Sequence, residues 1–108
     1  MEQRKYQRFA DSSPVVFSSE NIKGEGRIDN LSRGGAAIFS EIAISRGEYI
    51  TLTISLDSQP QAIEIELAPV RWVKEGSFGV EFIRIAPGSQ ELLTQYLDRL
   101  EGTSTEAA

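Results

Sequence analysis

The sequence of 108 residues contains neither cysteine nor histidine. The lack of cysteine excludes disulfide bonds, thiolate catalysis and cysteine-ligated zinc. The lack of histidine removes the commonest general base near neutral pH and the commonest transition-metal ligand. Ser32 has neither a histidine partner nor a nucleophile-elbow motif, and no other catalytic constellation is visible. The sequence therefore predicts a binding module, not an enzyme, with no metal and no cofactor.

Long apolar runs and a net positive charge are also lacking. No segment approaches the roughly 20 apolar residues that cross a bilayer, and the polar N-terminus has no signal-peptide core. We therefore expect a cytoplasmic protein, or the cytoplasmic part of a larger one, with no membrane span. The formal net charge of −5 argues against duplex nucleic acid as a partner. The length and the hydrophobic fraction of 40% fit one globular domain.

Positive charge is concentrated at the N-terminus. Arg4, Lys5 and Arg8 outnumber Glu2 there, whereas residues 89–108 are mainly acidic. A local group of cations on an acidic body suits a small anionic ligand. The alternative, that these residues form only a solvated tail, stays open on composition alone.

Apolar residues alternate with polar ones through much of the chain. The clearest case is 49–56, where every second residue is Ile or Leu, the period of a half-buried strand. Further strands are expected at 14–19, at 24–29, from residue 36, at 63–73 with a bulge at Pro69, and at 78–82. Turns are expected at 20–21, 30–35, 57–60 and 75–77.

The period becomes helical after Pro87 and Gly88. Ser89 is the expected N-cap and Gly102 the expected stop. Leucines and a tyrosine recur on one face, which we interpret as a core face, with self-association into a homodimer as the alternative: Leu92, Leu93, Tyr96, Leu97 and Leu100. The prediction is an all-β domain, a six-stranded antiparallel β-barrel with one C-terminal α-helix. A flexible N-terminal arm (1–13) precedes the barrel and helix (14–101), and a frayed tail (102–108) follows.

Two motifs carry chemical content. Arg4 and Arg8, four residues apart, direct two guanidinium groups to one side of the chain, and each offers a planar fork of donors to a phosphate or a guanine edge. The second motif runs from Asn30 to Gly35 and contains Ser32. Asn and Ser side chains can organise a turn, and paired glycines allow positive φ and close ligand approach. An ordinary tight turn explains this motif equally well.

Together the two motifs resemble the PilZ domain family, which binds the bacterial second messenger cyclic di-GMP. The family pattern is Arg-x-x-x-Arg before the first barrel strand, then Asp/Asn-x-Ser-x-x-Gly. Arg4 and Arg8 fit the first part; Asn30, Ser32 and Gly35 fit the second, with Asn30 where many members have aspartate. Residues 70–73 and 79–82 also look like later strands of the family.

The resemblance implies a nucleotide-binding receptor of the PilZ-like split-barrel fold. It implies that the following residues bind cyclic di-GMP: Arg4, Arg8, Asn30, Ser32 and Gly35. Further contacts are expected from Gln3, Lys5, Arg33 and Gly34, and the position of Gln3 is one thought to influence whether one or two ligand molecules bind. The arm would close over the ligand and signal to an unidentified downstream protein.

Two alternatives to this function remain. One is a PilZ-like protein-interaction adaptor that binds no nucleotide, and the other is a barrel for single-stranded nucleic acid, which the acidic charge disfavours. For Trp72, the only tryptophan, packing in the core or on the barrel surface is favoured over base stacking.

Overall fold

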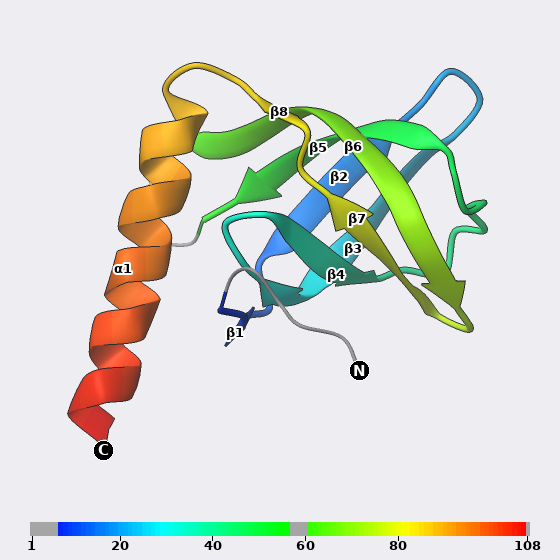
Figure 1. Ribbon diagram of the computed structural model, residues 1–108. Coiled ribbons are helices and arrows are strands. Elements are labelled where there is room, and N and C mark those ends of the chain that lie inside the picture. Colours follow the sequence, from blue (N-terminus) through cyan, green and yellow to red (C-terminus); the bar gives the residue numbers. More distant parts are fainter. Residues whose placement is uncertain (1–6, 57–60, 108) are drawn as a thin grey trace.

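The computed structural model is a closed antiparallel barrel with one helix beside it (Figure 1). It describes residues 7–56 and 61–107, and the side chains of residues 7–56 and 61–101. The barrel strands are β2 (Pro14–Ser18), β3 (Lys23–Leu31), β4 (Gly35–Phe39), β5 (Tyr49–Ser55), β6 (Ala62–Lys74) and β7 (Ser77–Glu81). Outside the ring lie β1 (Phe9–Ala10), β8 (Arg84–Ile85) and the helix α1 (Ser89–Ala107). The predicted six-stranded barrel with a C-terminal helix is confirmed.

The ring closes because β3 pairs with β4 on one side and with β2 on the other. The remaining pairs are β2 with β5, β5 with β6, β6 with β7 and β7 with β4, all antiparallel. Each barrel strand therefore has a neighbour on both sides, which removes the exposed edges that favour aggregation. The short strands add to this ring, β1 along β3 and β8 along β6.

The alternating residues fill the inside of the barrel. Ile50, Leu52 and Ile54 of β5 are each at most 1% exposed, as their period predicts. Phe17 and Phe78 meet edge to face across the core, with ring centroids 5.2 Å apart. Burial of each such side chain contributes about 1.5–3 kcal/mol to stability, so the alternation stabilises the fold directly.

Two bulges bend the long strand β6. The register slips by one residue between the pairs of Ile50 and Leu52 and again between Val70 and Trp72. Each slip leaves one extra residue on β6 and increases the local twist. Pro69 lies between the slips and does not end the strand, since it still pairs with Tyr49.

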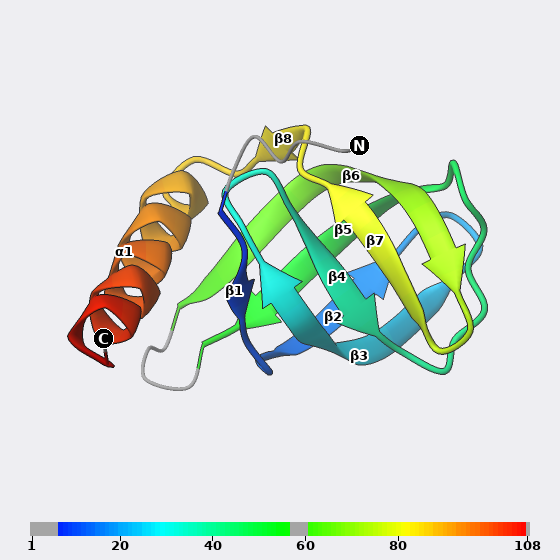
Figure 2. The ribbon, with the colours of Figure 1, turned by 60° about the horizontal axis from the view of Figure 1, so that its bottom comes forward.

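The helix α1 packs its apolar face on the barrel, as predicted. Leu93 and Leu97 are buried, and the remaining members of the stripe pack against the core. Figures 1 and 2 both show α1 to one side of the barrel, reached from β8. Among the described residues, no helix is long and apolar enough to cross a membrane.

Both predicted ends of the helix were wrong. The Gly88 carbonyl accepts the first helical hydrogen bond, from the Leu92 N–H, while the Ser89 hydroxyl accepts one from the Glu64 backbone N–H (2.8 Å). Ser89 thus holds the helix to β6 instead of capping it. The helix also continues through Gly102 to Ala107, because a single glycine costs a helix only about 1 kcal/mol relative to alanine.

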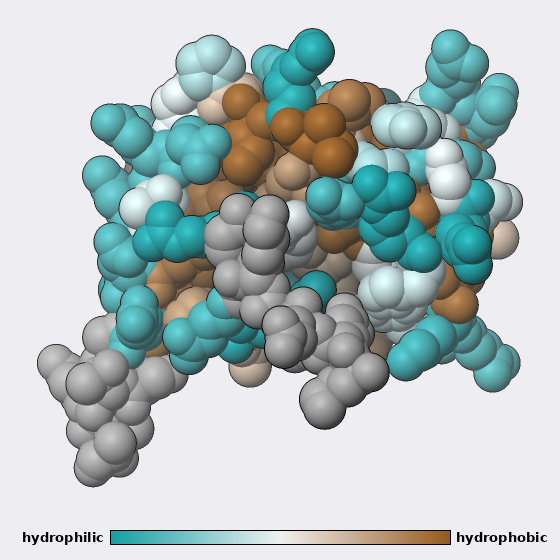
Figure 3. Space-filling view, viewed as in Figure 1, coloured by the Kyte–Doolittle hydropathy of each residue, from teal (hydrophilic) through white to brown (hydrophobic). Residues whose placement is uncertain are grey.

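Exposed hydrophobic residues lie at several places on the surface. Figure 3 shows hydrophobic side chains gathered over β8 and the neighbouring part of β6, surrounded by hydrophilic ones. The large hydrophobic residues with the greatest exposure are Val16, Phe39, Ile42, Tyr49, Val73 and Ile83.

Candidate ligand-binding site

The structure brings the two predicted motifs together at the end of β3. A guanidinium N–H of Arg8 donates to the side-chain oxygen of Asn30, with 2.5 Å between Nη1 and Oδ1. The backbone explains this meeting, because β1 follows Arg8 and pairs Phe9 with Leu31 and Ala10 with Asn30. Gln3, Arg4 and Lys5 lie outside the described residues.

The described part of the arm is attached to β3. Beyond β1, the Asp11 N–H donates to the Asp29 carbonyl, and the Ile28 N–H donates to the Ser13 carbonyl. The Arg27 guanidinium donates to the Ser12 carbonyl (2.9 Å). Residues 9–13 of the predicted arm lie along the barrel, because these backbone groups find partners there, and the flexibility of the arm stays a prediction.

The second motif is more ordered than the predicted turn over 30–35. Asn30 and Leu31 complete β3 and Gly35 begins β4, so the turn itself is 32–34. The buried Ser32 organises this turn: its hydroxyl donates to the Gly35 carbonyl (3.3 Å) and accepts from the Gly34 N–H (3.2 Å). A ligand contact by Ser32 stays a prediction. In the structure the Ser32 side chain stabilises the turn.

Gly35 is required by the packing of two strands. A Cβ atom at this position would lie 2.4 Å from the backbone carbonyl oxygen of Val80 on β7. The positive-φ glycines of the described chain are Gly47, Gly76 and Gly88, so positive φ does not explain this residue. The close approach of β4 to β7 explains why this position is glycine.

The outer face of the barrel beside Asn30 is lined by small residues and ends at an aromatic ring. Asn30 pairs with Ala37, Ala37 with Gly79, and Gly79 with Trp72, which forms one row across four strands. Core residues flank the first three members of this row, so Asn30, Ala37 and Gly79 point outward. The flanking residues are Leu31, Ala36, Ile38, Phe78 and Val80. The indole of Trp72 occupies the space over Gly79, because a Cβ atom on Gly79 would lie 2.2 Å from the indole atoms Cε2 and Nε1. This arrangement agrees with barrel-surface packing of Trp72.

The row therefore forms a shelf, which we define as Asn30, Ala37, Gly79 and Trp72 with Arg8 at its end. Sequence reasoning did not place Trp72 on it, because the bulge in β6 decides that Trp72 comes opposite Gly79. The Arg8 guanidinium offers donors at one end of the shelf, and the indole of Trp72 lies at the other, with the Lys74 ammonium 5.2 Å from the centroid of its ring. Such a shelf can hold an anionic group and a planar base.

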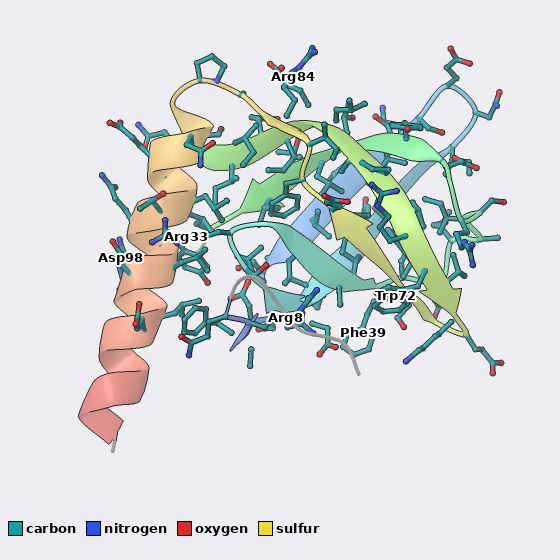
Figure 4. All side chains as sticks on the ribbon, in the orientation of Figure 1. Arg8, Arg33, Phe39, Trp72, Arg84 and Asp98 are labelled. Atoms are coloured by element: carbon teal, nitrogen blue, oxygen red, sulfur yellow. The ribbon has the colours of Figure 1, made fainter. Side chains whose placement is uncertain are left out.

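Two other arginines near the shelf form ion pairs. Arg33 binds Asp98 of α1 (3.3 Å between Nη2 and Oδ1), and Arg71 binds Glu81 (2.6 Å between Nη2 and Oε1). Figure 4 shows Arg33 and Asp98 facing each other between the turn and the helix. Within the described part of the chain, Arg8 has no ion pair and its charge is available to an anion.

Solved structures share this fold over nearly the whole chain. The Bacillus subtilis inhibitor of motility (MotI/DgrA) matches with a TM-score of 0.78 and 26% identity, over 95% of this chain and 53% of the inhibitor. The PilZ domain of Escherichia coli YcgR, solved with c-di-GMP, matches with a TM-score of 0.76 and 16% identity over 98% and 97% of the two chains. K. pneumonia MrkH in its c-di-GMP complex matches with a TM-score of 0.72 and 15% identity, over 100% of this chain and 56% of MrkH.

The chain thus spans about half the length of the inhibitor of motility and of MrkH. No curated protein matches the sequence. The sequence profile of the PilZ domain matches residues 2–99, which include both arginines of the first motif and the whole of the second. The chain belongs to the PilZ domain family.

Proposed function

We propose that this chain is a cyclic di-GMP receptor whose ligand binds on the shelf. The observation that carries the proposal is the hydrogen bond between Arg8 and Asn30, which joins the two motifs of the family in one place. The c-di-GMP-bound PilZ structures among the similar folds support it. Arg4, Ser32 and Gly35 complete the proposed binding set, and Gln3, Lys5, Arg33 and Gly34 are proposed to add contacts.

The chemistry of the shelf suits this ligand. Cyclic di-GMP carries two phosphates and two guanines, and the guanidinium fork of Arg8 can hold either a phosphate or the O6/N7 edge of guanine. The amide of Asn30 can donate and accept along a base edge. Because a single hydrogen bond joins Arg8 to Asn30, whose amide nitrogen donates to Asp29 (3.4 Å), the ligand would replace one hydrogen bond and supply the negative charge that Arg8 lacks.

We further propose that ligand binding moves the arm and that a partner protein recognises the change. The pairing of β1 with β3 involves only two residue pairs, whereas residues 11–13 are held by further hydrogen bonds, so we expect the movement to be confined to the arm up to Ala10. The alternative function is an adaptor that binds protein without nucleotide.

Isothermal titration calorimetry with cyclic di-GMP tests the proposal. We expect binding by the unmodified chain, and Arg8→Ala to weaken it by about 1–3 kcal/mol, because a hydrogen bond to a charged group is lost. Arg84→Ala is the matched control, since Arg84 is an exposed arginine on the other side of the barrel (Figure 4). Absence of heat at tens of micromolar protein would favour the adaptor instead.

A further inference from the structure

A groove lies beside the shelf, on strands β3 and β4. Its floor contains Pro14, Arg27 and Phe39, its rim carries Glu25 and Glu41, and its volume is about 620 Å³. Arg27 pairs directly with Phe39. Phe39 follows Ala37 of the shelf by two residues on β4, so the groove and the shelf are neighbours.

The groove exists because β3 is longer than β4. β4 ends at Phe39, while β3 extends back to Lys23 without a β4 partner. The chain after Phe39 turns across this gap, held by a hydrogen bond from the Ser40 hydroxyl to the Glu25 carbonyl (2.8 Å). Gly26 keeps the crossing close, since a Cβ there would lie 2.2 Å from the Phe39 carbonyl oxygen. Hydrogen bonding and packing of the backbone thus hold the groove open.

An aromatic side chain is left exposed in this groove. Phe39 is 52% exposed and points away from the core, on the same side of the barrel as Trp72 (Figure 4). The surface continues into a smaller hollow lined by Ile42 and Val73, which are 40% and 43% exposed. Three exposed apolar residues around two connected hollows resemble the apolar centre of a protein interface more than isolated surface residues.

The charge of the rim differs from that of the shelf. The groove lining carries two carboxylates, Glu25 and Glu41, against one cation, Arg27, whose hydrogen bond to the neutral Ser12 carbonyl leaves its charge in place. The groove lining is therefore net negative by one charge, on a chain whose formal net charge is −5, while Lys74 lies in the lining of the smaller hollow. This sign disfavours a phosphate-bearing ligand and favours a cationic one.

We infer that the groove binds a cationic segment of a partner protein, in which an aromatic or aliphatic residue lies between lysines or arginines. The apolar residue would pack on Phe39 and the flanking cations would pair with Glu25 and Glu41. Peptide recognition of this kind combines an apolar anchor with charges of opposite sign at the rim. The inference goes beyond nucleotide binding and does not depend on it.

Selection from a random dodecapeptide phage library on the immobilised full chain tests the inference without a known partner. We expect enriched peptides to carry lysine or arginine on both sides of an aromatic or aliphatic residue. The synthetic, fluorescein-labelled peptides are then titrated with the chain by fluorescence anisotropy. Phe39→Ser and, separately, Glu41→Lys should each weaken binding by about tenfold or more, as truncation of an interface anchor does.

Matched controls come from other faces of the barrel. Tyr49→Ser changes an aromatic residue that is 60% exposed, and Glu66→Lys changes an exposed carboxylate on β6; both should leave peptide affinity within about twofold, as surface changes away from an interface do. Phe39→Ser should keep the thermal unfolding midpoint and the cyclic di-GMP affinity of the unmodified chain. This last measurement separates failure of the groove from failure of the nucleotide site.

Three outcomes would overturn the inference. Enriched peptides without positive charge would contradict the role of the rim. Equal weakening by the Tyr49 and Phe39 variants would indicate nonspecific binding. Sedimentation that shows a dimer dissociated by Phe39→Ser would assign the groove to a second copy of the chain.

Discussion

Two glycines on the outer face of the barrel make the same space for different neighbours. At Gly35 the neighbour is the backbone carbonyl of Val80, and at Gly79 it is the indole of Trp72. A carbonyl within a paired strand cannot move without disturbing hydrogen bonds, whereas a half-exposed side chain can change rotamer. Substitutions at these two positions therefore distinguish crowding against the backbone from crowding against a side chain.

We expect Gly35→Ala to lower the free energy of unfolding by about 1–3 kcal/mol, the range found for overpacking. Gly79→Ala should cost less and should change the emission of the displaced Trp72. Urea denaturation of both variants, followed by far-ultraviolet circular dichroism, provides the comparison. Equal losses of stability would contradict the distinction between the two neighbours.

Trp72 should report ligand binding directly. It is the only tryptophan and it lies at the end of the shelf, so a base stacked near it should quench its fluorescence. A titration with cyclic di-GMP should give the same dissociation constant by fluorescence as by calorimetry. In the Arg8→Ala variant the quenching curve should move to higher ligand concentration. Binding heat without any change in emission would place the ligand away from the shelf.

At the scale of elements, α1 is tied to the arm and to the turn of the second motif. The Tyr96 hydroxyl donates to a carboxylate oxygen of Asp11 in the arm (2.5 Å) and lies 3.4 Å from the Ser13 hydroxyl. Arg33 in the motif turn pairs with Asp98. The arm, the turn and the helix are thus linked by side-chain contacts as well as by the barrel, and the helix is placed to respond when the arm moves.

The contact of Tyr96 should stabilise the fold measurably. Tyr96→Phe removes a partly buried hydrogen bond to a carboxylate, and we expect a loss of about 1–3 kcal/mol in urea denaturation. Tyr49→Phe is the control because the Tyr49 side chain is 60% exposed, and its cost should be close to zero. A similar loss in both variants would mean that the hydroxyl of Tyr96 contributes nothing specific.

The sequence predicted those elements whose signals are local and repeated. The alternation of Ile50, Leu52 and Ile54 identified β5 because burial on one face of a strand requires a period of two. Strands β1 and β8 were missed, since two residues are too few to show a period. The start of the helix was wrong because Ser89 binds the backbone of Glu64 on a distant strand, and such a contact leaves no local pattern.

The candidate site also has parts that the sequence predicted and parts that it did not. Arg8 and Asn30 were found together because both belong to a motif of the family, and the pairing of β1 with β3 supplies the contact. Trp72 joins the shelf only through a bulge, and the groove at Phe39 depends on where β4 ends relative to β3. Register and strand length across the barrel are properties of the assembled fold, so single-sequence patterns do not reveal them.

At the scale of the whole molecule, an acidic chain presents a cationic site and an anionic groove side by side. The shelf and the groove are separated by two residues along β4, about 7 Å along an extended strand. Cyclic di-GMP would bring two negative charges to the shelf, next to a groove proposed to hold a cationic segment. In water, two opposite unit charges attract by about 0.6 kcal/mol at a separation of about 7 Å, and by less at greater separation, before salt screening. The two ligands should therefore assist each other.

We expect saturating cyclic di-GMP to raise the affinity of a selected cationic peptide by about threefold to tenfold in low salt, and less at higher ionic strength. Thermodynamic linkage requires the peptide to raise the affinity for cyclic di-GMP by the same factor. Anisotropy titrations of the peptide and calorimetry of the dinucleotide, each with and without the other ligand, measure both sides. Anisotropy and calorimetry are repeated with a control peptide that has glutamine in place of every lysine and arginine, and this peptide should lose most of the effect.

If the neutral peptide shows the same enhancement, movement of the arm carries the coupling instead of charge. The hydrogen bond from Arg27 to the Ser12 carbonyl, which joins the groove to the arm, would then be the structural route of the coupling.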